Sequence, residues 1–167
     1  MKAIVVAYGK NLEIGADNDM PWSNSLKDDL KHFKQLTSDS TIIVGRKTFA
    51  SFGNRPLPNR ENIVVTRANE EIEGTIVAHS LDEAYALASS ENIFVIGGGQ
   101  VYAEAINDMD VLYITEVNAS FDNATVLFPK IDLSLWNEVD RDHHDADERN
   151  LYSFDFITYE KIKNATA

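Results

Sequence analysis

The sequence predicts an α/β fold in which a mixed, mainly parallel sheet is flanked by helices. Apolar runs of strand length occur at residues 3–8, 41–44, 62–66, 75–77, 93–96, 111–117 and 152–159. Helical patterns separate several of them, at residues 26–36, 80–89 and 99–107. Strands rich in isoleucine and valine that alternate with helices are typical of a parallel sheet covered on both faces. Two strand-like stretches between Trp136 and Tyr159, joined by the polar run 140–150, predict an antiparallel hairpin at a sheet edge.

The composition of the chain excludes several classes of protein and of functional site. The 167 residues correspond to about one domain, so we assign residues 1–167 to a single domain. The absence of cysteine excludes a disulfide framework, a thiolate nucleophile and a cysteine-based zinc site. The formal charge of −12 argues against nucleic acid as a partner. No apolar run approaches the length of a membrane span or a signal peptide, so we expect a cytoplasmic enzyme or binding protein.

The helical pattern at residues 26–36 places one carboxylate on an apolar surface. At 100° per residue, Asp29 lies inside the apolar stripe of this helix, whereas Asp28 lies outside it. The stripe consists of Leu26, Leu30, Phe33 and Leu36. An ionisable group directed at a core is costly unless a partner or a ligand satisfies it. Asp29 is therefore the leading candidate for a functional residue.

The helix at residues 80–89 has a local start signal of its own. Ser80 followed by Glu83 is a capping-box pattern, which predicts a helix that begins next to Ser80.

Two strand-to-helix junctions carry features of a phosphate site. The strand Ile93–Ile96 leads into Gly97-Gly98-Gly99, and the strand Thr41–Val44 leads into Gly45-Arg46-Lys47-Thr48. Glycines allow backbone amides to approach a ligand closely, and a helix start favours a phosphate. A tight turn without a ligand is the alternative for the three glycines, and we favour binding. Both junctions would lie at the carboxyl ends of parallel strands, where a dinucleotide could use them together with Thr66-Arg67.

Other catalytic arrangements have little support. His143-His144-Asp145 could suggest a metal site, but adjacent histidines in a polar loop are usually solvated, and we predict no metal. Neither a Gly-x-Ser-x-Gly nucleophile elbow nor a Walker loop occurs.

An ordered set of motifs resembles the dihydrofolate reductase family, of the bacterial or phage type. The motifs are Ile14-Gly15, Asn18-x-Met20-Pro21-Trp22, Asp29-Leu30-x-x-Phe33-Lys34, Gly45-Arg46-x-Thr48, Arg55-Pro56-Leu57-Pro58-x-Arg60 and Ile96-Gly97-Gly98-Gly99-x-Val101-Tyr102. The resemblance implies an eight-stranded mixed sheet with four helices. It also implies reduction of 7,8-dihydrofolate to tetrahydrofolate for one-carbon metabolism, with NADPH giving a hydride to C6 and a proton added at N5. Members are commonly monomeric.

The resemblance assigns roles to individual residues. Asp29 would hold the pterin ring and favour protonation of N5, Thr115 would support its carboxylate, and Trp22 would orient a water nearby. The expected substrate-binding set is Val5, Val6, Ala7, Asp29, Phe33, Phe52, Arg55, Leu57, Arg60, Ile96, Tyr102 and Thr115, in which Arg60 pairs with the α-carboxylate of the substrate.

The implied NADPH-binding set is larger. It comprises Ala7, Ile14, Gly15, Asn18, Met20, Gly45, Arg46, Lys47, Thr48, Thr66, Arg67, His79, Gly97, Gly98, Gly99, Gln100, Val101 and Tyr102. Thr66 and Arg67 match the site for the 2′-phosphate, which favours NADPH over NADH. Residues 13–24 match the loop that closes over the nicotinamide.

The chain also departs from the family pattern. The spacing between Trp22 and Asp29 is longer than in a common bacterial form, and Gln100 stands where many relatives carry arginine. Ala124 and Leu151 replace residues that bind the closing loop in some relatives. We therefore expect altered switching of that loop.

Two alternative functions remain open at this point. One is a reductase of the same fold that acts on another pterin or on a riboflavin precursor, and the other is a nucleotide-binding protein without turnover. The first class generally lacks the Asp29 and Arg60 pattern, and the second has no need of Asp29 and Thr115 to hold NADPH.

Overall fold

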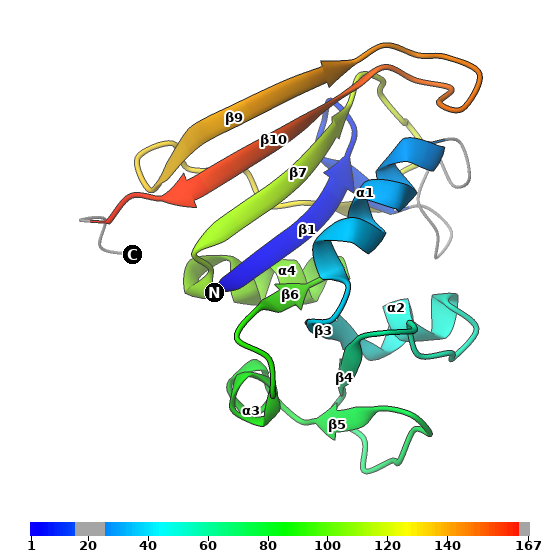
Figure 1. Ribbon diagram of the computed structural model, residues 1–167, viewed down its shortest axis with the longest axis vertical. Coiled ribbons are helices and arrows are strands. Elements are labelled where there is room, and N and C mark those ends of the chain that lie inside the picture. Colours follow the sequence, from blue (N-terminus) through cyan, green and yellow to red (C-terminus); the bar gives the residue numbers. More distant parts are fainter. Residues whose placement is uncertain (16–25, 164–167) are drawn as a thin grey trace.

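A computed structural model describes residues 1–15 and 26–163 of the chain, which form an eight-stranded mixed sheet (Figure 1). The strand order is β5-β4-β3-β6-β1-β7-β10-β9. The pairs from β5 to β7 are parallel, and β10 pairs antiparallel with both β7 and β9. The predicted fold class, with its parallel body and its C-terminal antiparallel hairpin, is therefore confirmed.

The strands of this sheet are short in its parallel half and long near the hairpin. They are β1 (Lys2–Tyr8), β3 (Thr41–Gly45), β4 (Glu61–Val65), β5 (Ile76–Ala78), β6 (Ile93–Val95), β7 (Val111–Val117), β9 (Trp136–His144) and β10 (Phe154–Lys161). A separate two-stranded sheet joins β2 (Glu13–Gly15) to β8 (Val126–Leu127).

In the described part of the chain, four α-helices accompany the sheet. They are α1 (Lys27–Thr37), α2 (Arg46–Ser51), α3 (Leu81–Leu87) and α4 (Gly99–Ala105), and the 3-10 turn η1 (Ile106–Asp108) follows α4. Within the described residues, every helix is too short or too polar to span a bilayer.

Strand alternation divides the core between the two faces of the sheet. Ile4 and Ile43 belong to a cluster with side chains of α3 and α4, whereas their neighbours Ala3 and Ile42 belong to a cluster with α2 and Phe33 of α1. Successive side chains of a strand point to opposite faces, so each strand contributes to both clusters. The sheet is thus covered on both sides, as the continuous apolar runs predict.

The main correction to the predicted elements concerns β9. The polar run that begins at Asp140 is not a loop throughout, because β9 continues to His144. Nearly all of its side chains are exposed, and cross-strand pairs support it: Arg141 and His143 both bind Asp155 of β10, at 2.7 and 2.5 Å. An edge strand can therefore form without an apolar pattern. β2 and β8 were also missed, because two or three residues are too few to show a period.

Candidate functional site

Asp29 of α1 meets the sheet at Thr115 of β7. The Thr115 hydroxyl donates a hydrogen bond to Asp29 Oδ1 at 2.6 Å. Thr115 is held in turn by strand pairing, opposite Ala7 of β1 on one side and Phe156 of β10 on the other. The predicted pair is thus brought together by residues that lie 86 positions apart.

Asp28 lies on a different side of the helix, as the helical period predicts. Its carboxylate accepts hydrogen bonds from Arg149 at 2.8 Å and from Asn150 at 2.9 Å. These bonds, the one from Arg149 first, hold the pKa of Asp28 below its usual value. For Asp29, burial raises the pKa to about 6, although the Thr115 hydrogen bond acts in the opposite direction. The pKa values of the two adjacent carboxyl groups are therefore shifted in opposite directions.

The apolar stripe around Asp29 is only partly buried, which corrects the expectation that it faces a core. Leu26 is 2% exposed and packs in a cluster with Val117 and Phe154. Leu30, on the same stripe, is 42% exposed. The stripe therefore offers apolar surface next to a perturbed carboxyl group, a combination suited to a flat polar ring.

The raised pKa has a consequence for stability. A folded-state pKa of about 6, above the ordinary 3.8, means that the folded chain holds this proton more tightly than the unfolded chain. The resulting stabilisation is complete below about pH 4 and is lost as the pH rises through 6. In the ligand-free protein, the ionised Asp29 is thus destabilising at pH 8.

We predict that Asp29→Asn raises the free energy of unfolding at pH 8 by about 1–3 kcal/mol, and has a much smaller effect at pH 4. Urea unfolding at the two pH values measures this difference. Asp28→Asn is the matched control, and its expected effect has the opposite sign because the pKa of Asp28 is lowered. Equal or lower stability of Asp29→Asn at pH 8 would contradict the assigned environment.

The expected substrate walls form one group on the face that α1 and α2 cover. Val5, Phe33, Phe52 and Leu57 are partly buried and pack against the same cluster, which contains Ile96. Tyr102 is buried and donates a hydrogen bond from its hydroxyl to the carbonyl of Val5 at 2.8 Å. Burial, together with the nearby Asp29 charge, raises the pKa of Tyr102, so its phenol stays protonated. The side chains of Val6 and Tyr102 both pack in the cluster on the opposite face, so Val6 reaches the group through its backbone and Tyr102 through its hydroxyl bond to Val5.

Arg60 is fixed at the far end of α1. It donates to the Thr37 hydroxyl at 3.0 Å and to the Pro58 carbonyl at 2.9 Å, and its guanidinium lies 5.8 Å from the centre of the Phe33 ring. Burial lowers its pKa, but an arginine keeps its charge. Arg55 is the other cation of the expected substrate-binding set. Its side chain is exposed and, unlike that of Arg60, is not held by Thr37 or Pro58.

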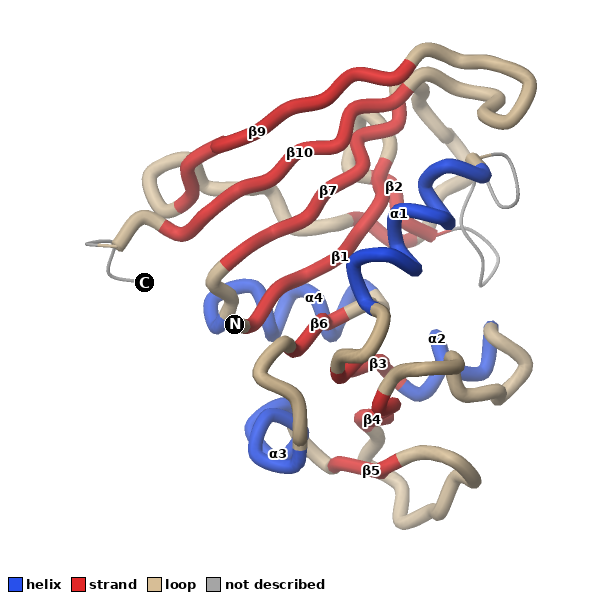
Figure 2. The backbone as a smooth tube through the Cα atoms, in the orientation of Figure 1, coloured by secondary structure: helices blue, strands red, loops and turns tan. Residues whose placement is uncertain are grey.

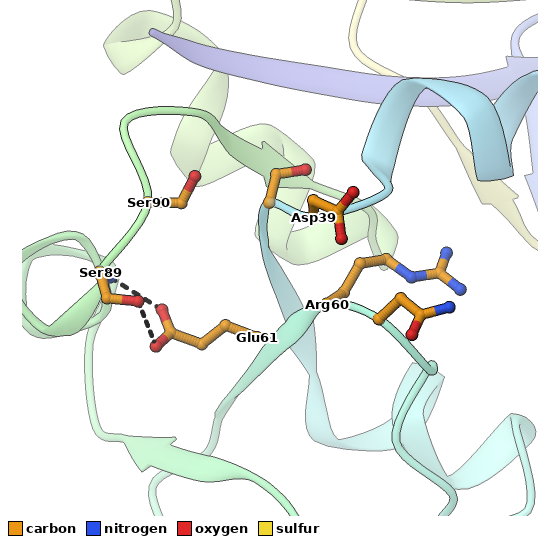
Figure 3. A pocket seen from close by; sticks show the side chains of 7 residues that line it. Asp39, Arg60, Glu61, Ser89 and Ser90 are labelled. Carbon is orange, nitrogen blue, oxygen red and sulfur yellow. Dashed lines mark hydrogen bonds between the residues drawn. The ribbon is translucent and has the colours of Figure 1, made fainter.

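Arg60 also lines a polar surface pocket of about 250 Å³ at the amino ends of β3 and β4 (Figure 3). The remaining lining residues are Asp39, Ser40, Asn59, Glu61, Ser89 and Ser90. Figure 3 shows the Glu61 carboxylate directed toward Ser89 while the Arg60 guanidinium extends the other way. Of the predicted site residues, this pocket includes Arg60 alone.

The two glycine junctions are adjacent, as predicted. The amide of Gly45 donates to the carbonyl of Gly97 at 2.8 Å. A side chain at Gly98 would lie 2.7 Å from the Thr48 hydroxyl, and Gly97 has a φ of 130°. Each of these glycines has a packing or backbone reason, so the glycine run alone does not require a ligand. The joint position of the two junctions is the stronger observation.

Charged side chains surround these junctions. Arg46 binds Glu70 at 2.7 Å and Asn54 at 2.7 Å, and the sequence analysis found neither partner. Lys47, Arg67 and His79 are exposed. The amide of Thr66 donates to the carbonyl of Ala78, which brings Arg67 and His79 to neighbouring strand ends. Val101 and Gln100 occupy the first turn of α4.

The strand β2 lies between the Gly97-Gly98-Gly99 junction and residues 119–127, and it contacts both. Ile14 lies beside Gly99, and the carbonyl of Gly15 accepts from the amide of Thr125 at 2.7 Å. Glu13, 3% exposed, accepts from the amides of Asn11 and Phe121. The Glu13 carboxylate of β2 thus links the segment that contains Asn11 to the segment that contains Phe121. Asn18, Met20 and Trp22, with most of the expected closing loop, lie outside the described residues, and their roles stay predictions.

His143 and His144 bind carboxylates rather than converging on one point. His143 contacts Asp155 and Asp145, and His144 contacts Asp142. Across residues 1–15 and 26–163, no three side chains of the metal-binding types gather closely enough to hold an ion.

Helix capping at α3 confirms another local prediction. The Ser80 hydroxyl accepts from the amide of Glu83 at 3.1 Å, and Glu83 accepts from the amide of His79 at 2.8 Å. The helix therefore begins at Leu81, next to Ser80, as the capping box predicts.

Comparison with known proteins gives one consistent result. A family model described as dihydrofolate reductase matches residues 1–161. A dihydrofolate reductase of Bacillus subtilis is 43% identical, covering 100% of this chain and 98% of the relative. A type 3 dihydrofolate reductase of Salmonella typhimurium is 45% identical, covering 93% and 95%. A solved dihydrofolate reductase from Enterococcus faecalis, complexed with NADP(H) and RAB-propyl, superimposes with a TM-score of 0.87 at 41% identity, covering 96% of both chains.

Proposed function

Because the chain belongs to the dihydrofolate reductase family, we propose that Asp29 and the two glycine junctions form the two halves of its active site. The activity is the NADPH-dependent reduction of 7,8-dihydrofolate to 5,6,7,8-tetrahydrofolate. The observation that carries the residue assignment is the Asp29 carboxylate, held by Thr115 beside a half-buried apolar surface.

Asp29 binds the pterin ring and controls its protonation in this proposal. A carboxylate can accept two parallel hydrogen bonds from N3 and the 2-amino group of the ring, a strong and directional arrangement. Thr115 occupies Oδ1 from the sheet side and fixes the orientation of the carboxylate. A group with a pKa of about 6 is close to the operating pH, which suits a residue that favours a proton on the substrate. The proton goes to N5 and the hydride to C6.

Two further groups of residues position the substrate. Val5, Phe33, Phe52, Leu57 and Ile96 supply apolar contacts for the pterin and aminobenzoyl rings. Arg60, already held by Thr37 and Pro58, retains free N–H donors for the α-carboxylate of the substrate. The substrate would therefore lie along α1, from Asp29 in its first turn to Arg60 near its last.

The glycine junctions fit the cofactor. NADPH, when bound, supplies the hydride. The absence of a side chain at Gly98 lets the Thr48 hydroxyl lie close to the glycine turn, and Arg46 and Lys47 lie at the same junction. Thr66, Arg67 and His79, at the adjacent strand ends, are suited to the 2′-phosphate. Arg46 would exchange its Glu70 partner for a cofactor phosphate.

The setting of the activity is also part of the proposal. The first and last major strands, β1 and β10, belong to one sheet, which supports a single domain. The charge of −12 supports a protein that avoids nucleic acid, and we place it in the cytoplasm as a monomer.

The direct test follows NADPH oxidation on addition of 7,8-dihydrofolate. We expect turnover with NADPH, much weaker turnover with NADH, and none without dihydrofolate. A dihydropterin without the aminobenzoyl-glutamate tail and a riboflavin precursor serve as comparison substrates. Faster oxidation with either of these than with dihydrofolate would contradict the proposed substrate.

A further inference from the structure

In the described part of the chain, α1 lacks a side-chain cap at the N-cap position of its first turn. The N-cap residue is Leu26, whose side chain cannot accept a hydrogen bond. Helix starts leave backbone amides without intrahelical partners, and a missing cap costs helix stability. Because Asp29 lies in this turn, whatever satisfies these amides also decides where its carboxylate lies.

The missing cap comes from the connection between β9 and β10. Asn150 Oδ1 accepts from the amide of Asp28 at 3.1 Å, and the carbonyl of Arg149 accepts from the amide of Lys27 at 3.3 Å. Asn150 forms an isolated bridge with Leu26 as well. Figure 2 shows this loop reaching back toward the start of α1. Two of the first-turn amides are thus satisfied by residues more than 120 positions away.

Asn150 is itself held firmly. It is 1% exposed, and its Nδ2 donates to Asp28 Oδ2 at 2.9 Å and to Asp147 Oδ1 at 3.0 Å. Its own amide donates to Asp147 Oδ1 at 2.9 Å. A buried amide with both ends bonded fixes one orientation, because leaving either end unpaired is costly. The side chain therefore acts as a rigid link between the loop and the helix.

The strand next to β10 in the sheet, β7, supplies the partner of Asp29. Thr115 lies opposite Phe156 in the β7–β10 register, and the loop that carries Asn150 leads directly into β10. Phe156 also stacks on His32 of α1, with ring centres 4.0 Å apart. The carboxylate is consequently located from two sides by one strand system, through Thr115 at its oxygen and through Asn150 at its backbone.

We propose that Asn150 is a positioning residue for Asp29, which caps the first turn of α1 from the β9–β10 loop and holds the carboxylate at the pterin-binding position. This inference rests on the role of Asp29 in the proposed function. Asn150 does not touch the substrate, so its removal acts through the position of Asp29.

The test compares Asn150→Ala with the parent enzyme in steady-state and single-turnover assays. We expect kcat/KM for dihydrofolate at pH 7 to fall by about three- to tenfold, mainly through a higher KM for dihydrofolate, while KM for NADPH stays unchanged. The midpoint of the pH profile of hydride transfer should fall by about 0.5 pH unit, because a loosened carboxylate gains water.

Two controls separate positioning from stability. Arg149→Ala removes only the exposed bond to Asp28 and leaves both Asn150 bonds, so its profile should match the parent. Ile63→Val, buried in β4 on the opposite cluster, loses a comparable amount of stability without touching α1. It should leave both the dihydrofolate KM and the pH midpoint unchanged.

Asp28→Ala approaches the same link from the exposed helix side and serves if Asn150→Ala does not fold. It removes one of the two acceptors of Asn150 Nδ2 and leaves Asp147, and we expect the same changes at about two- to threefold. The inference is overturned if both variants, or the one that folds, show the dihydrofolate KM and pH midpoint of Ile63→Val. Asp29→Asn is assayed alongside: unchanged activity there would refute the proposed role of Asp29, whereas its loss combined with unchanged Asn150 and Asp28 variants would refute the positioning role alone.

Discussion

Replacing Asp29 by asparagine is expected to lower the rate of dihydrofolate reduction at pH 7 by about 10²- to 10⁴-fold. The amide keeps the shape of the side chain and can still accept from Thr115, but it carries no charge and cannot pair with N3 and the 2-amino group as a carboxylate does. Stopped-flow measurement of hydride transfer, with NADPH and dihydrofolate both saturating, isolates this effect from binding.

Asp28→Asn is the control for charge and sequence position in the same helix turn. Its carboxylate binds Arg149 and Asn150 on another side of α1, so we expect less than a fivefold loss, on the scale of one neutral hydrogen bond. A rate for Asp29→Asn within tenfold of the parent would exclude the assigned role. Combined with the predicted gain in stability at pH 8, the rate loss would show that this group is retained for function at a cost in stability.

Replacing Arg60 by glutamine is expected to raise KM for dihydrofolate by about 10- to 100-fold, with little change in kcat. The expected size is that of a charge-assisted hydrogen bond to a carboxylate, and the contact is the same in the ground state and the transition state. Thr37 and Pro58 preorganise the guanidinium, so the parent loses little entropy on binding.

A dihydropterin without the glutamate tail is the matched comparison for Arg60. Its kcat/KM should be the same for the parent and for Arg60→Gln, because it lacks the carboxylate that the arginine binds. An equal loss with both substrates would instead indicate that the variant disturbs Phe33 or the end of α1.

The sequence predicts much of this architecture because the signals are local. Isoleucine and valine runs give the buried parallel strands, the helical period separates Asp29 from Asp28, and Ser80 and Glu83 mark the start of α3. Parallel strands end at the same edge of the sheet. Gly45 and Gly97, which follow or end two such strands, therefore lie in contact, as the strand–helix pattern predicts.

Features that depend on contacts between residues far apart in the chain could not be predicted from local sequence patterns. The polar strand β9 pairs along its length with β10, which also supplies Asp155 to two of its side chains. The partial exposure of Leu30 could not be read from a helical period, which gives the direction of a side chain and not what covers it. The cap from Asn150 and the Glu70 partner of Arg46 join residues whose separation hides them from any local pattern.

Asp29, through its raised pKa, is proposed to govern the proton requirement of hydride transfer. The most direct test is the pH profile of single-turnover hydride transfer for the parent enzyme and for Asp29→Asn. We predict that the parent rate falls as the pH rises through a midpoint near 6, and that this midpoint is absent from the asparagine variant. The same midpoint in both proteins would contradict this role of Asp29.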